Sequence, residues 1–391
     1  MKYDFDQEIS RYNTASLKWD DVERQYGEKD LIPLWVADMD FMSCTPVIEA
    51  LKKTVAHGVF GYPIQTESYR EVIADWMRKR FQWEVRPEWL HYSPGVVAAL
   101  SFLVQAFTQP GDKVLIQSPV YYPFSKAVTD NGRQLLHNPL KREGEHYKMD
   151  FDDLRKKVAL GAKMLILCSP HNPVGRVWTK EELTELGEIC IANNVLVVSD
   201  EIHADLLYPG YKHTPFAAIS EEFAQNCVVC TAASKTFNLA GLQNANIIIP
   251  NEKLGMMFRT VMDAPHLVRT NTFGAVATEA AYRDGEEWLE QVLVYLHQNL
   301  EFLTQYIGTN IKQLKVVPPE GTYLVWIDCS ELGMSSKELE QFMRKQAKVA
   351  IDDGYIFGPG GEGFIRINIA CTRKNLADGL RRIESAVNGK K

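Results

Sequence analysis

The sequence has few of the features that mark secreted or membrane proteins. Its 7 cysteines, among 391 residues, are scattered and odd in number, which makes a poor disulfide framework and fits a reducing cytosol. The amino-terminal stretch is polar and lacks the apolar segment of a secretory signal. No apolar run approaches the roughly 20 residues that a membrane helix needs. We therefore expect a cytoplasmic protein with no membrane partner.

An excess of positive charge is also missing. The chain has 43 Lys and Arg residues against 50 Asp and Glu residues, a formal net charge of -7. Proteins that follow the phosphates of a nucleic acid need a basic face, so this balance argues against a nucleic-acid partner. Hydrophobic residues make up 46% and charged residues 24%, which is ordinary globular composition. The length suggests two or three domains or subdomains.

The middle of the chain alternates short apolar runs with amphipathic stretches. One such stretch, residues 179–194, carries apolar residues at helical spacing. Apolar strands separated by helices are typical of an α/β fold, in which helices cover both faces of a mostly parallel sheet. The predicted strands are 113–117, 163–168, 195–199, 227–231 and 246–250.

The carboxyl-terminal part has a different, α+β pattern. The first 45 residues contain no βα repeat, and we expect them to return to this part of the molecule. The prediction is a large domain, 46–285, and a smaller discontinuous α+β domain, 1–45 with 286–391. The elements predicted for the carboxyl-terminal part are helices 286–308, 336–347 and 374–387 and strands 322–328 and 364–370.

Three polar side chains follow predicted strands directly. Lys235 comes just after 227–231, and a desolvated lysine has a lowered pKa and can form a Schiff base with a carbonyl. Asp200 follows 195–199 and could pair with a protonated ring nitrogen. Asn172 stands in a rigid His-Asn-Pro turn. Taken singly, each has an ordinary alternative: an exposed loop lysine, a helix cap or solvated acid, and a plain turn.

Two further features follow the same pattern. Residues 92–107 read as a turn and a strong helix, whose first free N–H groups near Gly95, Val96 and Val97 could bind phosphate. Tyr121 could lie on a planar ring, although core packing is the ordinary alternative. Open α/β sheets bind ligands at the carboxyl ends of their strands. An amine, a carboxylate, an amide, an aromatic side chain and a phosphate cradle there together match pyridoxal 5′-phosphate.

The order of these motifs along the chain is SPG, PVYYPF, HNPVG, SDEIH, SKTFNLAG and RIN. This order resembles the fold-type I pyridoxal-phosphate enzymes of the class I/II aminotransferase family, over nearly the whole chain. Further strings, LIPLWVADMDF, HGVFGYP, DEIHADL, KTFNLAGLQ and GPGGEGFIRIN, resemble its C–S lyase branch, the cystathionine β-lyases of the MalY/PatB type. The resemblance implies the fold of that family, with a large cofactor-binding domain and a smaller one.

The resemblance also implies roles for single residues. Lys235 would bind pyridoxal phosphate covalently, and Asp200 would pair with its pyridine nitrogen. Asn172 would bond the ring oxygen, and Tyr121 would stack on the ring. Arg366 would bind the substrate carboxylate, which suits the guanidinium fork.

The remaining implied residues concern the substrate side and the subunit interface. Ala37, Asp38 and Tyr323 would line the substrate side. Tyr62 would reach into the neighbouring subunit's site, which implies an obligate homodimer with shared active sites.

The chain departs from the aminotransferase pattern at three positions. Aminotransferases often carry a tyrosine where His203 stands, an arginine where Gln243 stands, and a serine where Ala232 stands. Ser234 is then the nearby hydroxyl. We count His203 and Ser234 among the predicted cofactor neighbours, and the phosphate contacts are only partly assigned.

No metal site is predicted. Cys227 and Cys230 have CxxC spacing, but they lie within an apolar strand, where a buried pair is the better interpretation. His203 and Asp205 could be metal ligands, yet no third ligand stands at a suitable spacing.

The predicted function is α,β-elimination of L-cystathionine, or of a related S-substituted cysteine, to a thiol, pyruvate and ammonia. The closest alternative is an aminotransferase on the same scaffold. A more remote alternative is a non-catalytic ligand-sensing regulator, but the sequence shows no basic helix-turn-helix segment.

Overall fold

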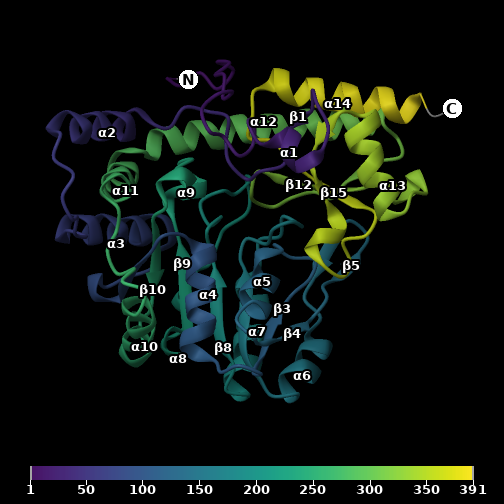
Figure 1. Cartoon of the computed structure of the whole chain (residues 1–391). Helices are drawn as coiled ribbons and strands as arrows, with labels where there is room; N and C mark the ends of the chain where they lie inside the picture. Colours follow the sequence, from purple (N-terminus) through teal and green to yellow (C-terminus); the bar gives the residue numbers. More distant parts are fainter. Residues whose placement is uncertain (1, 390–391) are drawn as a thin grey trace.

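A computed structural model describes residues 2–389 of the chain. A central sheet with its covering helices forms the lower part of the molecule in Figure 1, and a smaller sheet lies above it under two long helices. Within residues 2–389, no helix is both long and apolar enough to cross a membrane.

The central sheet has seven strands, and most neighbours run parallel. Only β10 is antiparallel to both of its neighbours, so the predicted mostly parallel sheet is confirmed. Between β9 and β10 the chain forms only the short turns α9 and η3, Ala233–Thr236 and Ala240–Leu242. A parallel crossover normally needs a full helix, so β10 returns in the opposite direction. The strands, in spatial order, are β2 (Leu90–Ser93), β10 (Ala245–Ile248), β9 (Cys227–Thr231), β8 (Leu196–Asp200), β7 (Ala162–Cys168), β3 (Lys113–Ile116) and β4 (Gln134–His137).

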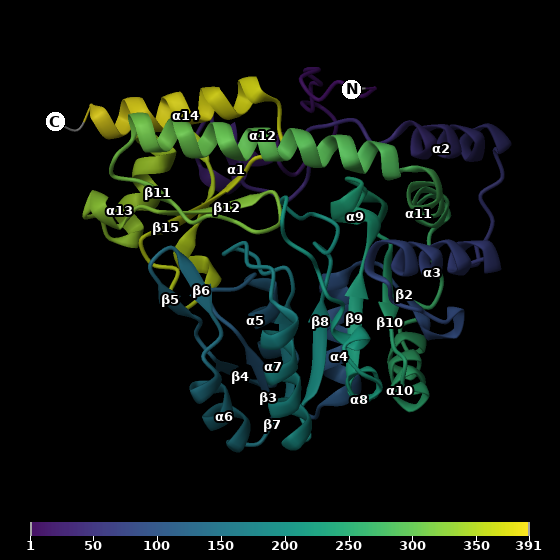
Figure 2. The same ribbon diagram turned by 180° about the vertical axis from the view of Figure 1, so that it is seen from behind.

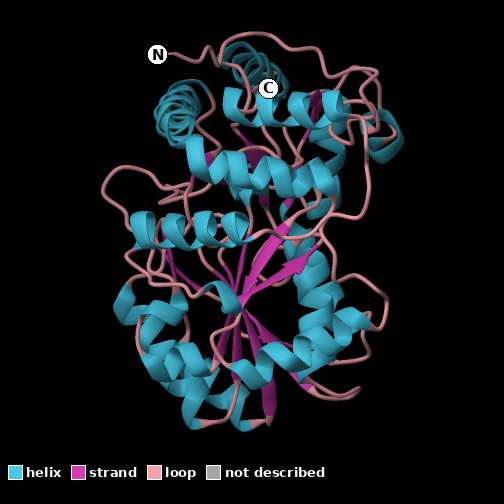
Figure 3. Cartoon of the chain, turned by 90° about the vertical axis from the view of Figure 1, so that its left-hand side faces the viewer, coloured by secondary structure: helices cyan, strands magenta, loops and turns pink. Residues whose placement is uncertain are grey.

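Helices cover both faces of this sheet, as Figure 3 shows in side view. The helix predicted at 179–194 is α7, which begins with a capping box between Thr179 and Glu182. Its apolar side, including Leu183 and Leu186, is buried in the main core. The strands between the two helical layers are apolar because neither of their faces meets water. The helices of this part of the chain are α2 (Thr45–His57), α3 (Glu67–Phe81), α4 (Val96–Phe107), α5 (Pro123–Thr129), α6 (Phe151–Ala159), α7 (Lys180–Ala192), α8 (Glu221–Gln225), α10 (Glu252–Asp263) and α11 (Thr272–Asp284).

The carboxyl-terminal part contains a second, antiparallel sheet with the order β11-β12-β15-β14. The predicted long helix is α12, and it packs beside the last helix, α14, across the top of the molecule (Figures 1 and 2). The helix predicted at 336–347 is α13 followed by a π-helical turn, Phe342–Gln346. The elements are α12 (Glu286–Asn310), β11 (Lys315–Val316), β12 (Leu324–Asp328), α13 (Ser336–Gln341), β14 (Asp352–Asp353), β15 (Phe364–Asn368) and α14 (Arg373–Asn388), and a small hairpin, β5 (Lys141–Glu143) and β6 (His146–Lys148), belongs to the preceding part of the chain.

The amino-terminal segment lies against this second sheet. After the short helix α1 (Val22–Tyr26), β1 (Ile32–Pro33) pairs in parallel with β13 (Val349–Ala350). Arg382 of α14 donates a hydrogen bond of 2.6 Å to the carbonyl of Asp30. These contacts support a discontinuous small domain, and its boundaries at 45 and 286 stay a prediction.

Four charged side chains tie two parts of the amino-terminal segment together. We call Arg11, Lys18, Asp38 and Asp40 the amino-terminal charge cluster. Lys18 is fully buried, and its Nζ lies 2.9 Å from Asp40 Oδ2 and 3.6 Å from Asp38 Oδ1. Arg11 lies 2.6 Å from Asp38 and 2.7 Å from Asp40. Burial alone would raise the pKa of Asp40, but Lys18, Trp19 and Arg11 outweigh it and hold this pKa below its ordinary value.

We expect Lys18→Met to lower the free energy of unfolding by about 3–5 kcal/mol, because Asp38 and Asp40 would keep only Arg11 as a counter-ion in a buried site. Urea denaturation at pH 7 measures the change. Lys52→Met is the matched control: its amine also pairs with a carboxylate, that of Glu49, at 2.9 Å, but both side chains are exposed, so stability should hardly change. Equal stability of the two variants would contradict the assigned role of Lys18.

Candidate active site

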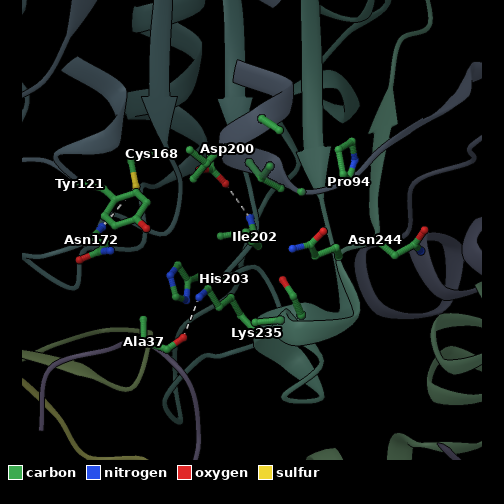
Figure 4. Close-up of a pocket in the computed structure, with 17 residues that line it drawn as sticks. Ala37, Pro94, Tyr121, Cys168, Asn172, Asp200, Ile202, His203, Lys235 and Asn244 are labelled. Carbon is green, nitrogen blue, oxygen red and sulfur yellow. Dashed lines mark hydrogen bonds between the residues drawn. The ribbon is translucent and has the colours of Figure 1, made fainter. Parts of the chain in front are cut away.

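The carboxyl ends of β7, β8 and β9 surround a cavity of about 400 Å³. Figure 4 shows polar side chains from separate loops pointing into one space, among them Lys235, His203 and Asp200. Strands that run parallel end at the same edge, which is why distant parts of the sequence meet here. The predicted site residues that line the cavity are Ala37, Gly95, Val96, Val97, Tyr121, Asn172, Asp200, His203, Ser234 and Lys235.

Lys235 supplies the amine of the site. It lies on the turn α9 directly after β9, and its Nζ donates a hydrogen bond of 2.6 Å to the carbonyl oxygen of Ala37. Burial lowers the pKa of Lys235 to about 8; the Asp38 carboxylate opposes this shift, and the Arg366 guanidinium adds to it. The amine is therefore neutral, and nucleophilic, in a larger fraction of molecules near pH 8 than an exposed lysine would be.

Asp200 supplies a buried carboxylate at the end of β8. Its Oδ1 accepts a hydrogen bond of 3.1 Å from the N–H of Ile202 (Figure 4). Burial raises the pKa of Asp200 to about 7, against the opposing effects of that hydrogen bond and of the Lys235 charge. Among the residues 2–389 that the structure describes, none forms an ion pair with Asp200. The site therefore holds a carboxylate that a cationic ligand group would stabilise in its charged form.

Asn172 and Tyr121 form another part of the cavity wall, and Arg366 lies behind Asn172. The N–H of Tyr121 donates 3.0 Å to the carbonyl of Asn172, which joins the loops after β3 and β7. Arg366 Nη1 donates 2.8 Å to Asn172 Oδ1, and its other nitrogen Nη2 contacts Asp352 and the carbonyl of Trp35. The Nε of Arg366 is buried without a partner among the described residues. A buried cation with an unused hydrogen-bond donor favours an anionic ligand beside it.

His203 and Tyr323 lie beside Lys235. The Tyr323 hydroxyl donates 3.0 Å to the carbonyl of Ala37, the group that also accepts from Lys235. The His203 ring meets the Tyr323 ring edge-on at 6.0 Å. Burial, with the charges of Lys235 and Arg366, puts the pKa of His203 well below its ordinary value, so the imidazole is neutral. Its Nδ1 has no hydrogen-bond partner within residues 2–389.

The beginning of α4 forms the remaining end of the cavity. Gly95 is its N-cap residue, and the N–H groups of the first turn, from Val96 on, have no partner within the helix. Ser234 lies nearby in the lining, as does Gln243 at the position where an arginine is frequent in aminotransferases. The free N–H groups of a helix start and its dipole favour an anion at this end.

A model of the family described as aminotransferase class I and II matches residues 29–383. The chain belongs to this family. It is 45% identical over 385 residues to the cystathionine beta-lyase PatB of Bacillus subtilis, which covers 98% of this chain and 100% of that relative. It is 31% identical over 388 residues to the protein MalY of Escherichia coli, with 98% and 99% coverage.

Solved structures agree with this assignment to the aminotransferase class I and II family. Cystalysin from Treponema denticola, whose crystal structure contains a pyridoxal 5′-phosphate cofactor, superposes with a TM-score of 0.97 at 40% identity and covers 100% of both chains. The PLP-bound C–S lyase from Staphylococcus hominis superposes with a TM-score of 0.92 at 36% identity over 98% of both chains. The predicted fold class is confirmed.

Some predicted site residues of this aminotransferase-family chain stand behind the lining. Arg366 and Tyr323 reach the cavity through Asn172 and Ala37. The Asp38 carboxylate pairs with Arg11. Tyr62 is 90% exposed and stacks under the Arg269 guanidinium at 5.2 Å, outside the cavity. Its predicted place in a partner's site is a separate proposal, taken up below.

Other lining residues were missed in the sequence. Cys168 ends β7, and its sulfur accepts the N–H of Asn172 at 3.3 Å. Asn244 is buried, and its side chain donates to the Tyr69 hydroxyl and to Thr278. The position of Cys168 at a strand end is a signal that could have found it. The remaining missed lining residues are Pro94, Ala98, Ile202 and Ala240.

Proposed function

We infer that this chain is a pyridoxal-phosphate-dependent C–S β-lyase that splits L-cystathionine or a related S-substituted cysteine. The observation that carries this inference is the partly buried Lys235 amine, which lies in one cavity with Asp200 and with the N–H groups of α4. The relatives named cystathionine beta-lyase, among them one from Corynebacterium glutamicum at 33% identity over 96% of this chain, support the reaction class.

The residues present fit this cofactor group by group. The aldehyde requires a reactive amine, which Lys235 provides. The pyridinium nitrogen suits the Asp200 carboxylate, which has no other cation bound to it in the described part of the chain. The phosphate suits the free N–H groups at the start of α4. The unpartnered Nδ1 of His203 and Nε of Arg366 leave polar atoms for cofactor and substrate.

Once bound, pyridoxal phosphate supplies an electron sink for the pair of electrons left at the substrate Cα. The Lys235 amine would hold the cofactor and, once free, would accept the substrate Cα proton. Asp200 holds a proton on the pyridine nitrogen, because a buried carboxylate is stable in its charged form only beside a cation. Tyr121 and Asn172 line the same cavity as Lys235 (Figure 4) and would border the cofactor ring.

Arg366 binds the substrate carboxylate in this proposal. Asp352 already forms an ion pair with Arg366 within the protein. The guanidinium is therefore held in place before the substrate carboxylate binds to it. Loss of the Cα proton is followed by departure of the thiolate from Cβ. Water then releases pyruvate and ammonia, so that cystathionine and one water give homocysteine, pyruvate and ammonia.

We expect the wild-type protein, loaded with pyridoxal phosphate, to form pyruvate and a free thiol in equal amounts from L-cystathionine with no 2-oxo acid added. Lactate dehydrogenase and a thiol reagent measure the two products. Lys235→Ala should lose nearly all turnover, because it lacks both the attachment point and the base. Turnover only after addition of a 2-oxo acid would favour the aminotransferase alternative instead.

The pKa of Lys235 predicts a pH dependence for cofactor uptake. Only the neutral amine attacks the aldehyde, so attachment should be slow at pH 6.5, rise through pH 8 and level off above about pH 9. Stopped-flow absorbance after mixing the apoprotein with pyridoxal phosphate measures this rate. A rate that still climbs steeply beyond pH 10, as expected for an exposed lysine, would show that burial does not lower this pKa.

The protein is proposed to act as a homodimer whose active sites are shared between subunits. The segment around Tyr62 exposes an unusual series of large apolar side chains: Val59 is 72% exposed, Phe60 57% and Ile64 75%. Such a patch is typical of a protein interface. The proposed location is the cytoplasm, which suits the unpaired state of the cysteines.

Mixing two defective chains tests the shared site. In a heterodimer of Tyr62→Phe and Lys235→Ala, one active site would carry both defects and the other would carry neither. The mixture should therefore recover activity above that of either parent, measured after refolding the two chains together. Each parent refolded alone is the control. Heterodimers with activity no higher than the parents would place Tyr62 in its own subunit's site or in none.

A further inference from the structure

The carbonyl oxygen of Ala37 accepts hydrogen bonds from two side chains on one side of the cavity. Lys235 Nζ lies 2.6 Å from this oxygen and the Tyr323 hydroxyl 3.0 Å (Figure 4 shows the first bond). The segment around Ala37, residues 36–40, belongs to no helix or strand. Its place in the wall of the cavity must therefore come from other contacts.

Two asparagines bind the backbone of 36–40. Asn368 of β15 donates 2.6 Å to the carbonyl of Val36 and 2.7 Å to that of Asp38. Asn238, three residues beyond Lys235, accepts the N–H of Met39 and donates to the Met39 carbonyl, both at 2.9 Å. The segment thus touches the small sheet on one side and the lysine turn on the other.

The amino-terminal charge cluster binds the side chains of the same segment. Arg11 meets both oxygens of Asp38, at 2.9 and 2.6 Å, and also reaches Asp40. Lys18 approaches both carboxylates from the buried side. Asp38 follows Ala37 in the chain and is the acidic residue with the largest effect on the pKa of the Lys235 amine. Two cations therefore balance the two carboxylates next to the group that contacts the reacting amine.

We propose that Arg11 and Lys18 are positioning residues for Lys235. With Asp38 and Asp40 they hold residues 36–40 so that the Ala37 carbonyl faces the amine, and Arg11 sets how strongly the Asp38 charge acts on it. Neither residue touches the cavity, and the inference rests on the proposed role of Lys235 as the reacting amine.

The charges that face Lys235 give the expected sign. Asp38 and Asp200 favour its protonated form, whereas the Arg366 charge opposes it, and His203 is neutral. Without Arg11, the Asp38 carboxylate loses its bidentate counter-ion and a positive charge leaves the surroundings. Both changes stabilise a proton on the Lys235 nitrogen. Removing the Asp38 charge has the opposite effect, since the Arg11 cation is then unbalanced.

The test is a pH titration of the violet absorption band of the protein loaded with pyridoxal phosphate, whose change reports a proton on the Lys235 nitrogen. Arg11→Met should raise the midpoint by roughly half a unit or more. Arg11→Lys, which keeps the charge, should return most of the way to the wild-type midpoint. Asp38→Asn should lower the midpoint. Opposite shifts from the two partners of one ion pair are not expected from a general loss of packing.

Arg142→Met is the matched control. Arg142 is also partly buried and pairs with a buried carboxylate, Asp328, at 2.7 Å, but it lies on the β5 hairpin and not in the cluster. The Arg142→Met variant should be less stable than the wild type, but the midpoint of its pH titration should not change. An unchanged midpoint in folded Arg11→Met, or an equal shift in Arg142→Met, overturns the proposal. If Arg11→Met does not fold, the test rests on the titration midpoint of Asp38→Asn. A midpoint in that variant that is not lower than in the wild type overturns the proposal.

The same experiment separates this inference from the proposed function. If the wild-type protein forms no violet band with pyridoxal phosphate, both fail. If it forms the band and the Arg11 variant titrates like the wild type, only the positioning role fails, and the lyase proposal is unaffected.

Discussion

The hydrogen bond between Lys235 and the Ala37 carbonyl joins the two halves of the molecule at the point where the chemistry is proposed. Lys235 belongs to the large sheet through the turn after β9, and Ala37 belongs to a segment that Asn368 binds to the small sheet. An amine confined in this way loses water and part of its positive charge. In the proposed function the position of this nitrogen is decisive, because the cofactor would bind to it and the substrate proton would move to it.

Burial shifts the pKa values of the Lys235 amine and the Asp200 carboxylate in opposite directions and thereby separates their tasks. It brings the pKa of Lys235 down to about 8 and the pKa of Asp200 up to about 7. The amine is therefore available as a nucleophile and base, and the carboxylate is ready to pair with a cationic ligand group. In water both groups are well solvated, and neither pKa would be shifted in this way.

Much of the architecture was predictable because it follows from local patterns. The five strands of the middle region and α7 appear close to their predicted positions, since apolar runs and helical spacing are properties of neighbouring residues. The reversed direction of β10 and the pairing of β1 with β13 were not predicted. Both depend on contacts between residues far apart in sequence, and a two-residue strand such as β1 has no period from which to infer it.

The sequence by itself predicted the main groups of the proposed site: Lys235, Asp200, Asn172, Tyr121 and the start of α4 each follow a strand, and parallel strands end at one edge. Only the tertiary structure decided which groups touch. It paired Arg366 with Asn172 and Asp352, and it bound Asp38 to Arg11 and Lys18. The physical reason is that side-chain pairing requires closure of long loops, and its partners are selected by burial and charge in the folded chain rather than by spacing along it.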